Sequence, residues 1–240
     1  MTNKPYLQKV KFTGSDENSY PHNLSSIKNI QEIEFKTPVT FLVGENGVGK
    51  STIVEAIAVA MGLNAEGGNK NTTFETEATH SDLYKTLKLV KGAIRPKDWF
   101  FLRAESFYNV ASLMDEVGYL GGYGGKSLHH QSHGEAFMAV LSNKLAGNNG
   151  FYIFDEPEAA LSGQRQLNAL AEIHRLVKSG SQLIIATHSP ILMGYPNSTI
   201  YEVSENGIEE VDYEDTENYQ VTKAFLTRKD MMLESILQDD

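Results

Sequence analysis

Residues 44–52 read Gly-Glu-Asn-Gly-Val-Gly-Lys-Ser-Thr and fit the pattern G-x-x-x-x-G-K-[ST]. The five residues before them, 39–43, are apolar or β-branched, which is typical of a buried strand. After them, Ile53, Ile57 and Met61 recur at four-residue spacing and predict a helix. A glycine-rich turn between a buried strand and a helix is the setting that this pattern requires. The stretch therefore predicts a phosphate-binding loop in an α/β fold.

Each part of this loop has a physical task. The glycines let the backbone turn tightly, so that successive N–H groups and the positive end of the helix face the phosphates. We expect Lys50 to reach the β- and γ-phosphates and Ser51 to bind Mg²⁺. A turn that binds no ligand would leave both side chains unexplained. The residues expected to bind nucleotide here are Gly44, Asn46, Gly47, Val48, Gly49, Lys50, Ser51 and Thr52.

A pair of carboxylates ends a second apolar run, at residues 150–157, which read Gly-Phe-Tyr-Ile-Phe-Asp-Glu-Pro. A charged group at a buried strand end needs a partner, and a Mg²⁺ held opposite Ser51 would supply one for Asp155. Side chains alternate along a strand, so Glu156 points the other way and is expected to orient or deprotonate the attacking water. The alternative is that both acids only begin a turn before Pro157.

The rest of the chain predicts an α/β fold with a largely parallel sheet, because strand patterns alternate with helix patterns. Short apolar pieces separated by turn-forming residues in 1–36 predict a small antiparallel sheet. A helix is expected around 83–90. Further strands are expected at residues 99–102, 151–154 and 183–186, and further helices at 137–145 and 167–176.

Composition limits the class of protein. The formal net charge of −10 argues against a broadly basic nucleic-acid surface, although a local basic patch would still allow such binding. The chain has no cysteine, which excludes disulfides and thiolate metal sites. No apolar run is long enough for a signal peptide or a membrane span, so a cytoplasmic location is expected. The acidic stretch 202–217 is interpreted as a solvated edge.

Two further motifs make the chain similar to a known class. Residues 132–135, Ser-His-Gly-Glu, resemble the signature motif of ATP-binding-cassette (ABC) ATPases, LSGGQ in transporters. Residues 187–190, Thr-His-Ser-Pro, resemble the loop that carries the switch histidine of these enzymes. The motifs also follow the ABC order, which is phosphate loop, signature, Asp-Glu pair and histidine. The resemblance covers most of the chain, from residue 41 to residue 190.

The resemblance implies one ABC-type P-loop NTPase domain over residues 1–240, with an N-terminal antiparallel β subdomain and a helical lobe that bears the signature. It implies Mg²⁺-dependent ATP hydrolysis by a head-to-tail dimer that forms when ATP binds. The signature residues, expected at the γ-phosphate held by the other subunit, are Ser132, Gly134 and Glu135. The expected catalytic residues are Lys50, Glu156 and His188.

An ordinary structural role is the alternative for the signature. Ser132 followed three residues later by Glu135 also forms a capping box, which would only begin a helix. A helix start nevertheless offers a hydroxyl, N–H groups and a positive dipole to an anion, which supports the phosphate role.

Several positions depart from the transporter pattern. His133 and Glu135 replace a glycine and the glutamine of LSGGQ, and Ser162 stands where the dimer-facing loop often has aspartate. The glutamine expected after the strand near Phe100 is absent, and Glu105 is the nearest polar candidate for its metal contact. With these departures, the chain resembles the stand-alone ATPases of the ABC superfamily, which are related to SMC and DNA-repair ATPases, more than it resembles a transporter subunit.

The adenine base needs an aromatic or apolar face. Tyr20 lies about as far before Gly44 as the adenine-stacking tyrosine of ABC proteins does, and Phe12 or Tyr6 could serve instead.

The expected ligands and partners are ATP, Mg²⁺, a second copy of the chain and a protein that the sequence does not identify. Two other functions stay open: a nucleotide-gated interaction module with slow turnover, and the ATP-binding subunit of a transporter. A ring-forming AAA-type ATPase fits less well, because the signature and His188 would then have no role.

Overall fold

The computed structural model describes residues 5–13, 20–69, 81–105, 132–145 and 149–237, and these contain two β-sheets. The larger sheet has the strand order β5-β6-β7-β3-β8-β9. In chain order its strands are β3 (Val39–Val43), β5 (Asp98–Arg103), β6 (Gly150–Asp155), β7 (Gln182–Ala186), β8 (Thr199–Ser204) and β9 (Gly207–Glu210). All neighbouring pairs are parallel except β8 and β9. The predicted parallel sheet is confirmed.

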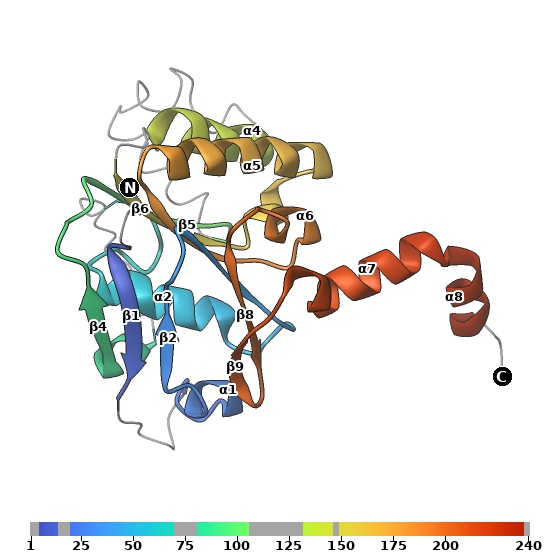
Figure 1. Ribbon diagram of the computed structural model, residues 1–240, viewed down its shortest axis with the longest axis horizontal. Helices are drawn as coiled ribbons and strands as arrows, with labels where there is room; N and C mark the ends of the chain where they lie inside the picture. The colour runs from blue at the N-terminus through green and yellow to red at the C-terminus, as the bar shows by residue number, and fades with distance from the viewer. Residues whose placement is uncertain (1–4, 14–19, 70–80, 106–131, 146–148, 238–240) are drawn as a thin grey trace.

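Helices cover both faces of this sheet (Figure 1). On one face lies α2 (Lys50–Ala60), and on the other lie α4 (His133–Ala139), α5 (Gly163–Lys178) and α6 (Pro190–Met193). Successive strand residues serve opposite faces: Phe151 and Ile153 join the core under α2, whereas Tyr152 and Phe154 join the core under α5. Burial on both faces explains why these strands read as continuous apolar runs.

The helix predicted around residues 137–145 is present in two parts. It comprises α4 and a π-helical turn at Val140–Lys144, which Leu145 follows. The glycines at positions 121, 122, 124 and 125 predict a flexible lead into this helix, and they lie outside the described residues.

The second sheet has the order β2-β1-β4 and is antiparallel, as predicted for the N-terminal region. It contains β1 (Leu7–Phe12), β2 (Glu32–Glu34) and β4 (Leu87–Lys91), and α1 (Ser25–Lys28) lies between β1 and β2 in the chain.

The prediction of a helix around 83–90 is wrong. Residues Asp82–Thr86 form a 3-10 turn and β4 follows. The spacing of Leu83, Leu87 and Val90 is typical of a helix, but residues 87–91 form a strand instead. They do so because β4 supplies hydrogen-bond partners for the second edge of β1. This tertiary pairing is invisible to local periodicity.

The C-terminal region leaves the body of the protein. The acidic stretch 202–217 includes β9, the edge strand of the larger sheet, where Glu209 and Glu210 are exposed as predicted. Helices α7 (Glu217–Thr227) and α8 (Lys229–Ile236) then project away from the sheets (Figure 1) and have no buried residue. Within the described residues, no helix combines the length and apolar character that crossing a membrane requires.

Candidate functional site

The phosphate loop connects β3 to α2, as predicted. Gly44, Gly47 and Gly49 have φ values of 133°, 82° and 98°, a region that favours glycine. At Gly44 a side chain is also excluded by space, because a Cβ would lie 2.2 Å from the carbonyl oxygen of Val203 on β8. The glycines thus allow both the tight turn and its close packing against the neighbouring strand.

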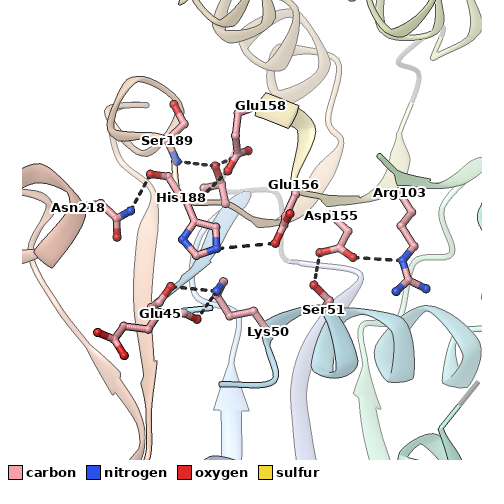
Figure 2. Close-up of polar contacts among 12 residues, drawn as sticks. Glu45, Lys50, Ser51, Arg103, Asp155, Glu156, Glu158, His188, Ser189 and Asn218 are labelled. Atoms are coloured by element: carbon pink, nitrogen blue, oxygen red, sulfur yellow. Dashed lines mark hydrogen bonds and ion pairs between the residues drawn. The ribbon is translucent and has the colours of Figure 1, made fainter. Parts of the chain in front are cut away.

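Lys50 begins α2 and its side chain folds back over the loop (Figure 2). Its Nζ donates hydrogen bonds to the carbonyl oxygens of Gly44 at 2.9 Å and Glu45 at 2.7 Å. Burial lowers the pKa of Lys50, and the nearby carboxylates of Glu156 and Asp155 oppose that effect. The ammonium group is therefore held at the loop and lacks full solvation, which favours an anion beside it.

Ser51 and Asp155 meet across the sheet edge. Ser51 Oγ donates to Asp155 Oδ1 at 3.0 Å (Figure 2). Burial raises the pKa of Asp155 to about 6, although the Arg103 guanidinium and the Ser51 hydroxyl act in the opposite direction. A buried carboxylate and a hydroxyl side by side are hard oxygen ligands, and a cation would offset the cost of ionising Asp155. The pair fits the Mg²⁺ expected from the sequence.

Arg103 is a site residue that the sequence analysis missed. It ends β5 opposite Asp155 in the register with β6, and its Nε lies 3.5 Å from Asp155 Oδ2. Its Nη1 pairs with Glu55 Oε2 on α2 at 2.9 Å. Its Nη2 pairs at 3.4 Å with Glu105, whose side chain is 82% exposed. The metal role of Glu105 stays a prediction. The signal available in the sequence was a positively charged residue, Arg103, at the end of an apolar strand.

Glu156 and His188 face each other beside the loop (Figure 2). The Glu156 carboxylate lies 3.7 Å from His188 Nε2. Glu156 has φ 50° and ψ 50°, a left-handed conformation that is uncommon outside glycine, and its N–H donates to the carbonyl oxygen of Ala186 at 2.9 Å. This conformation turns the chain sharply directly after Asp155. The two acids therefore point to different places because of this turn and not through alternation along a strand, since β6 ends at Asp155.

Burial lowers the pKa of His188, and the charge of Lys50 lowers it further. The imidazole is therefore neutral at pH 7, so one ring nitrogen can donate a hydrogen bond while the other accepts one. Its Nε2 atom is buried and, among the described residues, makes no hydrogen bond. The Glu156 carboxylate, 3.7 Å away, is the charged group paired with this atom.

Two further residues, Glu158 and Asn218, hold the His188 main chain. His188 N–H donates to Glu158 Oε1 at 2.5 Å, and the Thr187 hydroxyl donates to Glu158 Oε2 at 2.7 Å. Asn218 Nδ2, in the first turn of α7, donates to the His188 carbonyl oxygen at 2.9 Å. No sequence motif pointed to either residue. Asn218 had no local signal, because it lies 30 residues from its partner.

The capping box at the signature is confirmed. The Ser132 side chain accepts from Glu135 N–H at 3.4 Å, and Ser132 N–H donates to the Glu135 carboxylate at 2.9 Å. Gly134 is buried, and a Cβ there would lie 2.3 Å from Arg165 Nη1 and 2.7 Å from the Ala160 carbonyl oxygen. Packing thus explains this glycine, while Ser132 is exposed. Contact of these residues with a nucleotide in another subunit stays a prediction.

Of the three candidates for the adenine, Tyr20 lies beside the phosphate loop. Its hydroxyl lies 3.3 Å from Thr52 Oγ1, and its side chain is 64% exposed. It borders a cavity of about 370 Å³ that Ser51 and Thr52 also line. By contrast, the Tyr6 hydroxyl donates a hydrogen bond to the Gly180 carbonyl oxygen. Phe12 packs against the core.

Comparisons with known proteins agree with this geometry. A family model described as an AAA domain matches residues 21–98. A protein of Methanothermobacter thermautotrophicus named "Putative ABC transporter ATP-binding protein" is 25% identical over 215 residues, 79% of this chain and 74% of that protein. The DNA repair protein RAD50 of Drosophila melanogaster is 33% identical over 70 residues, 29% of this chain and 5% of that protein.

The fold is also found among solved structures. CbiO1 from Clostridium perfringens, part of the ABC transporter complex CbiONQ, matches with a TM-score of 0.55. It is 16% identical, and the match covers 95% of this chain and 97% of that chain. Together with the phosphate loop, the Ser51–Asp155 pair and the facing Glu156 and His188, the sequence likenesses support an ABC-superfamily P-loop ATPase related to RAD50.

Proposed function

We propose that this chain is a Mg²⁺-dependent ATPase that works as a head-to-tail dimer formed around ATP. The observation that supports hydrolysis best is the arrangement of one sheet edge, where Ser51 contacts Asp155 while Glu156 faces His188 beside Lys50. A site that only bound nucleotide would need Lys50 and the loop amides, but it would give Glu156 and His188 no task.

The residues divide the work of hydrolysis. The loop amides and Lys50 bind the β- and γ-phosphates, and Mg²⁺, when bound through Ser51 and Asp155, neutralises phosphate charge. Glu156 accepts the proton of the water that attacks the γ-phosphorus, while the bond from that phosphorus to the ADP oxygen breaks. A neutral His188 donates a hydrogen bond to the γ-phosphate. The products are ADP and inorganic phosphate.

A second copy would complete the site. Ser132 is exposed at the N-cap of α4, where its hydroxyl contacts Glu135 and Arg165. ABC proteins place this motif on the γ-phosphate of the other subunit, and an exposed Ser132 is what that arrangement needs. A Ser132 buried inside its own subunit would have contradicted it.

The test of the enzyme is hydrolysis of ATP by the purified protein with Mg²⁺. Glu156→Gln keeps the shape of the side chain but removes the base, so we expect a loss in kcat on the order of 10²-fold or more with ATP binding retained. Glu172→Gln on α5, where Glu172 pairs with Arg175, is the matched control and should keep full activity. Equal turnover by wild type and Glu156→Gln would refute the proposal.

A second candidate is the ATP-binding subunit of a transporter. It is favoured by the relative from M. thermautotrophicus, whose name assigns it that role and which matches over 79% of this chain. The absent loop glutamine speaks against it. Co-purification of a stoichiometric integral membrane protein with the chain from detergent-solubilised cells would support this candidate, and fractionation of the chain without one would remove it.

A further inference from the structure

The main chain of His188 is held from two sides by side chains that belong to different parts of the fold. Glu158 comes from the turn Pro157–Ala160 directly after the Asp-Glu pair. Asn218 comes from α7, the first helix of the projecting C-terminal region (Figure 2). Both the N–H and the C=O of His188 therefore have side-chain partners.

The Glu158 carboxylate makes two contacts with the loop that carries His188, residues 187–190. One oxygen accepts the His188 N–H at 2.5 Å and the other accepts the Thr187 hydroxyl at 2.7 Å. Thr187 Oγ1 in turn accepts the N–H of Ser189 at 3.0 Å. Hydrogen bonds to an ionised carboxylate are about twice as strong as neutral ones. This network therefore fixes the backbone of three successive residues relative to Glu156.

Asn218 acts from the opposite side. Its amide donates to the His188 carbonyl oxygen at 2.9 Å, and its neighbours Glu217 and Val221 line a cavity of about 500 Å³ that also borders His188. Helix α7 thus reaches the phosphate site through one hydrogen bond. A shift of α7 would therefore displace the carbonyl group of His188.

We infer that Glu158 and Asn218 are positioning residues that clamp the His188 main chain and so aim its imidazole at Glu156 and the γ-phosphate. This inference rests on the proposed ATPase function and assigns a task to two residues that no motif covers. It also makes α7 a part of the switch, so that the orientation of the C-terminal helices affects the position of His188.

Matched variants separate the clamp from general packing. Glu158→Ala removes both acceptors, whereas Glu158→Gln can still accept from His188 N–H and donate to the Thr187 hydroxyl. We expect kcat to fall on the order of 10²-fold for Glu158→Ala and less than about 10-fold for Glu158→Gln, with little change in ATP affinity. Asn218→Asp keeps the shape but sets an acceptor against the His188 carbonyl, so it should lose about 10-fold or more. Lys223→Ala, an exposed residue on α7, is the control.

A double-mutant cycle decides whether the two residues act through His188. In a His188→Ala background, Glu158→Ala and Asn218→Asp should each lower the remaining kcat by less than about 2-fold. Losses of the same size in both backgrounds would overturn the inference. So would equal activity of Glu158→Ala and wild type.

Resonances of His188 give a readout that needs no turnover. In protein labelled with ¹⁵N only at its seven histidines, the His188 amide is assigned by its loss in His188→Ala. Its hydrogen bond to the Glu158 carboxylate predicts a downfield proton shift. Glu158→Ala should move that signal upfield, and Glu158→Gln should move it less. If wild type hydrolyses no ATP, the ATPase proposal fails, and this measurement still decides whether the clamp exists. An unchanged amide signal in Glu158→Ala would refute it.

Discussion

Asp155 is a buried carboxyl group whose ionisation opposes the stability of the fold. Its pKa is raised from 3.8 to about 6 by burial, so the folded state binds more protons than the unfolded state between these two values. The free energy of unfolding therefore falls as the pH rises through this window. The shift corresponds to at most roughly 3 kcal/mol at pH 7. A bound cation would reverse the sign of this contribution.

The first prediction concerns Asp155→Asn. Without metal or nucleotide at pH 7, the variant should unfold at a higher temperature than wild type by a few degrees, and the difference should shrink toward pH 4.5. Adding Mg²⁺ and ATP should stabilise wild type more than the variant, because only the carboxylate binds the cation. Thermal unfolding across this pH range measures both effects. A variant that gains as much from Mg²⁺-ATP as wild type would contradict the metal assignment.

Gly134 illustrates a residue with two competing explanations. A Cβ at this position would meet Arg165 Nη1 at 2.3 Å and the Ala160 carbonyl oxygen at 2.7 Å. The second prediction is that Gly134→Ala lowers the free energy of unfolding of the nucleotide-free protein by about 1–3 kcal/mol. Urea unfolding tests it. Arg165→Ala should recover only part of the loss, because the carbonyl group remains in place. A Gly134→Ala protein of wild-type stability would leave nucleotide contact as the better explanation of this glycine.

At the scale of elements, α7 and α8 differ from every helix that covers the sheet. They have 11 and 8 residues, none of them buried, and they expose Val221, Leu226, Met231 and Ile236. Isolated helices this short are marginal in water. Their first turn is anchored to the body by the Asn218–His188 hydrogen bond and by Thr216, which is fully buried.

The third prediction follows from this lack of burial. Leu226→Gln and Ile236→Gln should each change the free energy of unfolding by less than about 0.5 kcal/mol. Leu176→Ala, in the core under α5, should cost about 2–5 kcal/mol. Urea unfolding of the nucleotide-free protein compares the three. If the two glutamine variants cost as much as Leu176→Ala, α7 and α8 are packed against another surface in solution.

At the scale of the whole molecule, the helix that follows the phosphate loop and the helix that follows Ser132 lie on opposite faces of the sheet. Helix α2 covers one face and α4 the other (Figure 1). In the proposed dimer, a second copy would therefore bring its signature to the phosphate loop of the first. The proposal predicts that ATP changes the association state.

The fourth prediction is that Glu156→Gln becomes dimeric in the presence of Mg²⁺ and ATP, because bound ATP persists in the absence of hydrolysis. Adding Ser132→Arg should keep the protein monomeric while a fluorescent ATP analogue still binds, since the loop of the same subunit is intact. Ala93→Arg, at an exposed position after β4, is the control for surface charge. Light scattering gives the mass. Dimerisation of the Ser132→Arg double variant to the same extent would exclude the signature from the interface.

The sequence by itself determined the parallel sheet, the phosphate loop and the pairing of Ser51 with Asp155. Local signals suffice there, because apolar strands buried on both faces are continuous in sequence, and because the carboxyl ends of neighbouring parallel strands meet at one edge. The capping box at Ser132 was also readable, since both partners lie within one helical turn.

Only the tertiary structure decided the rest. Residues Leu87–Lys91 became a strand because β1 offered an unpaired edge, against their helix-like spacing. Arg103, Glu158 and Asn218 joined the site through partners 30 or more residues away or on another strand, and no local pattern encodes such distances. Hydrogen bonds and ion pairs between distant segments depend on where the whole chain places them, whereas the periodicity of strands and helices depends only on neighbours.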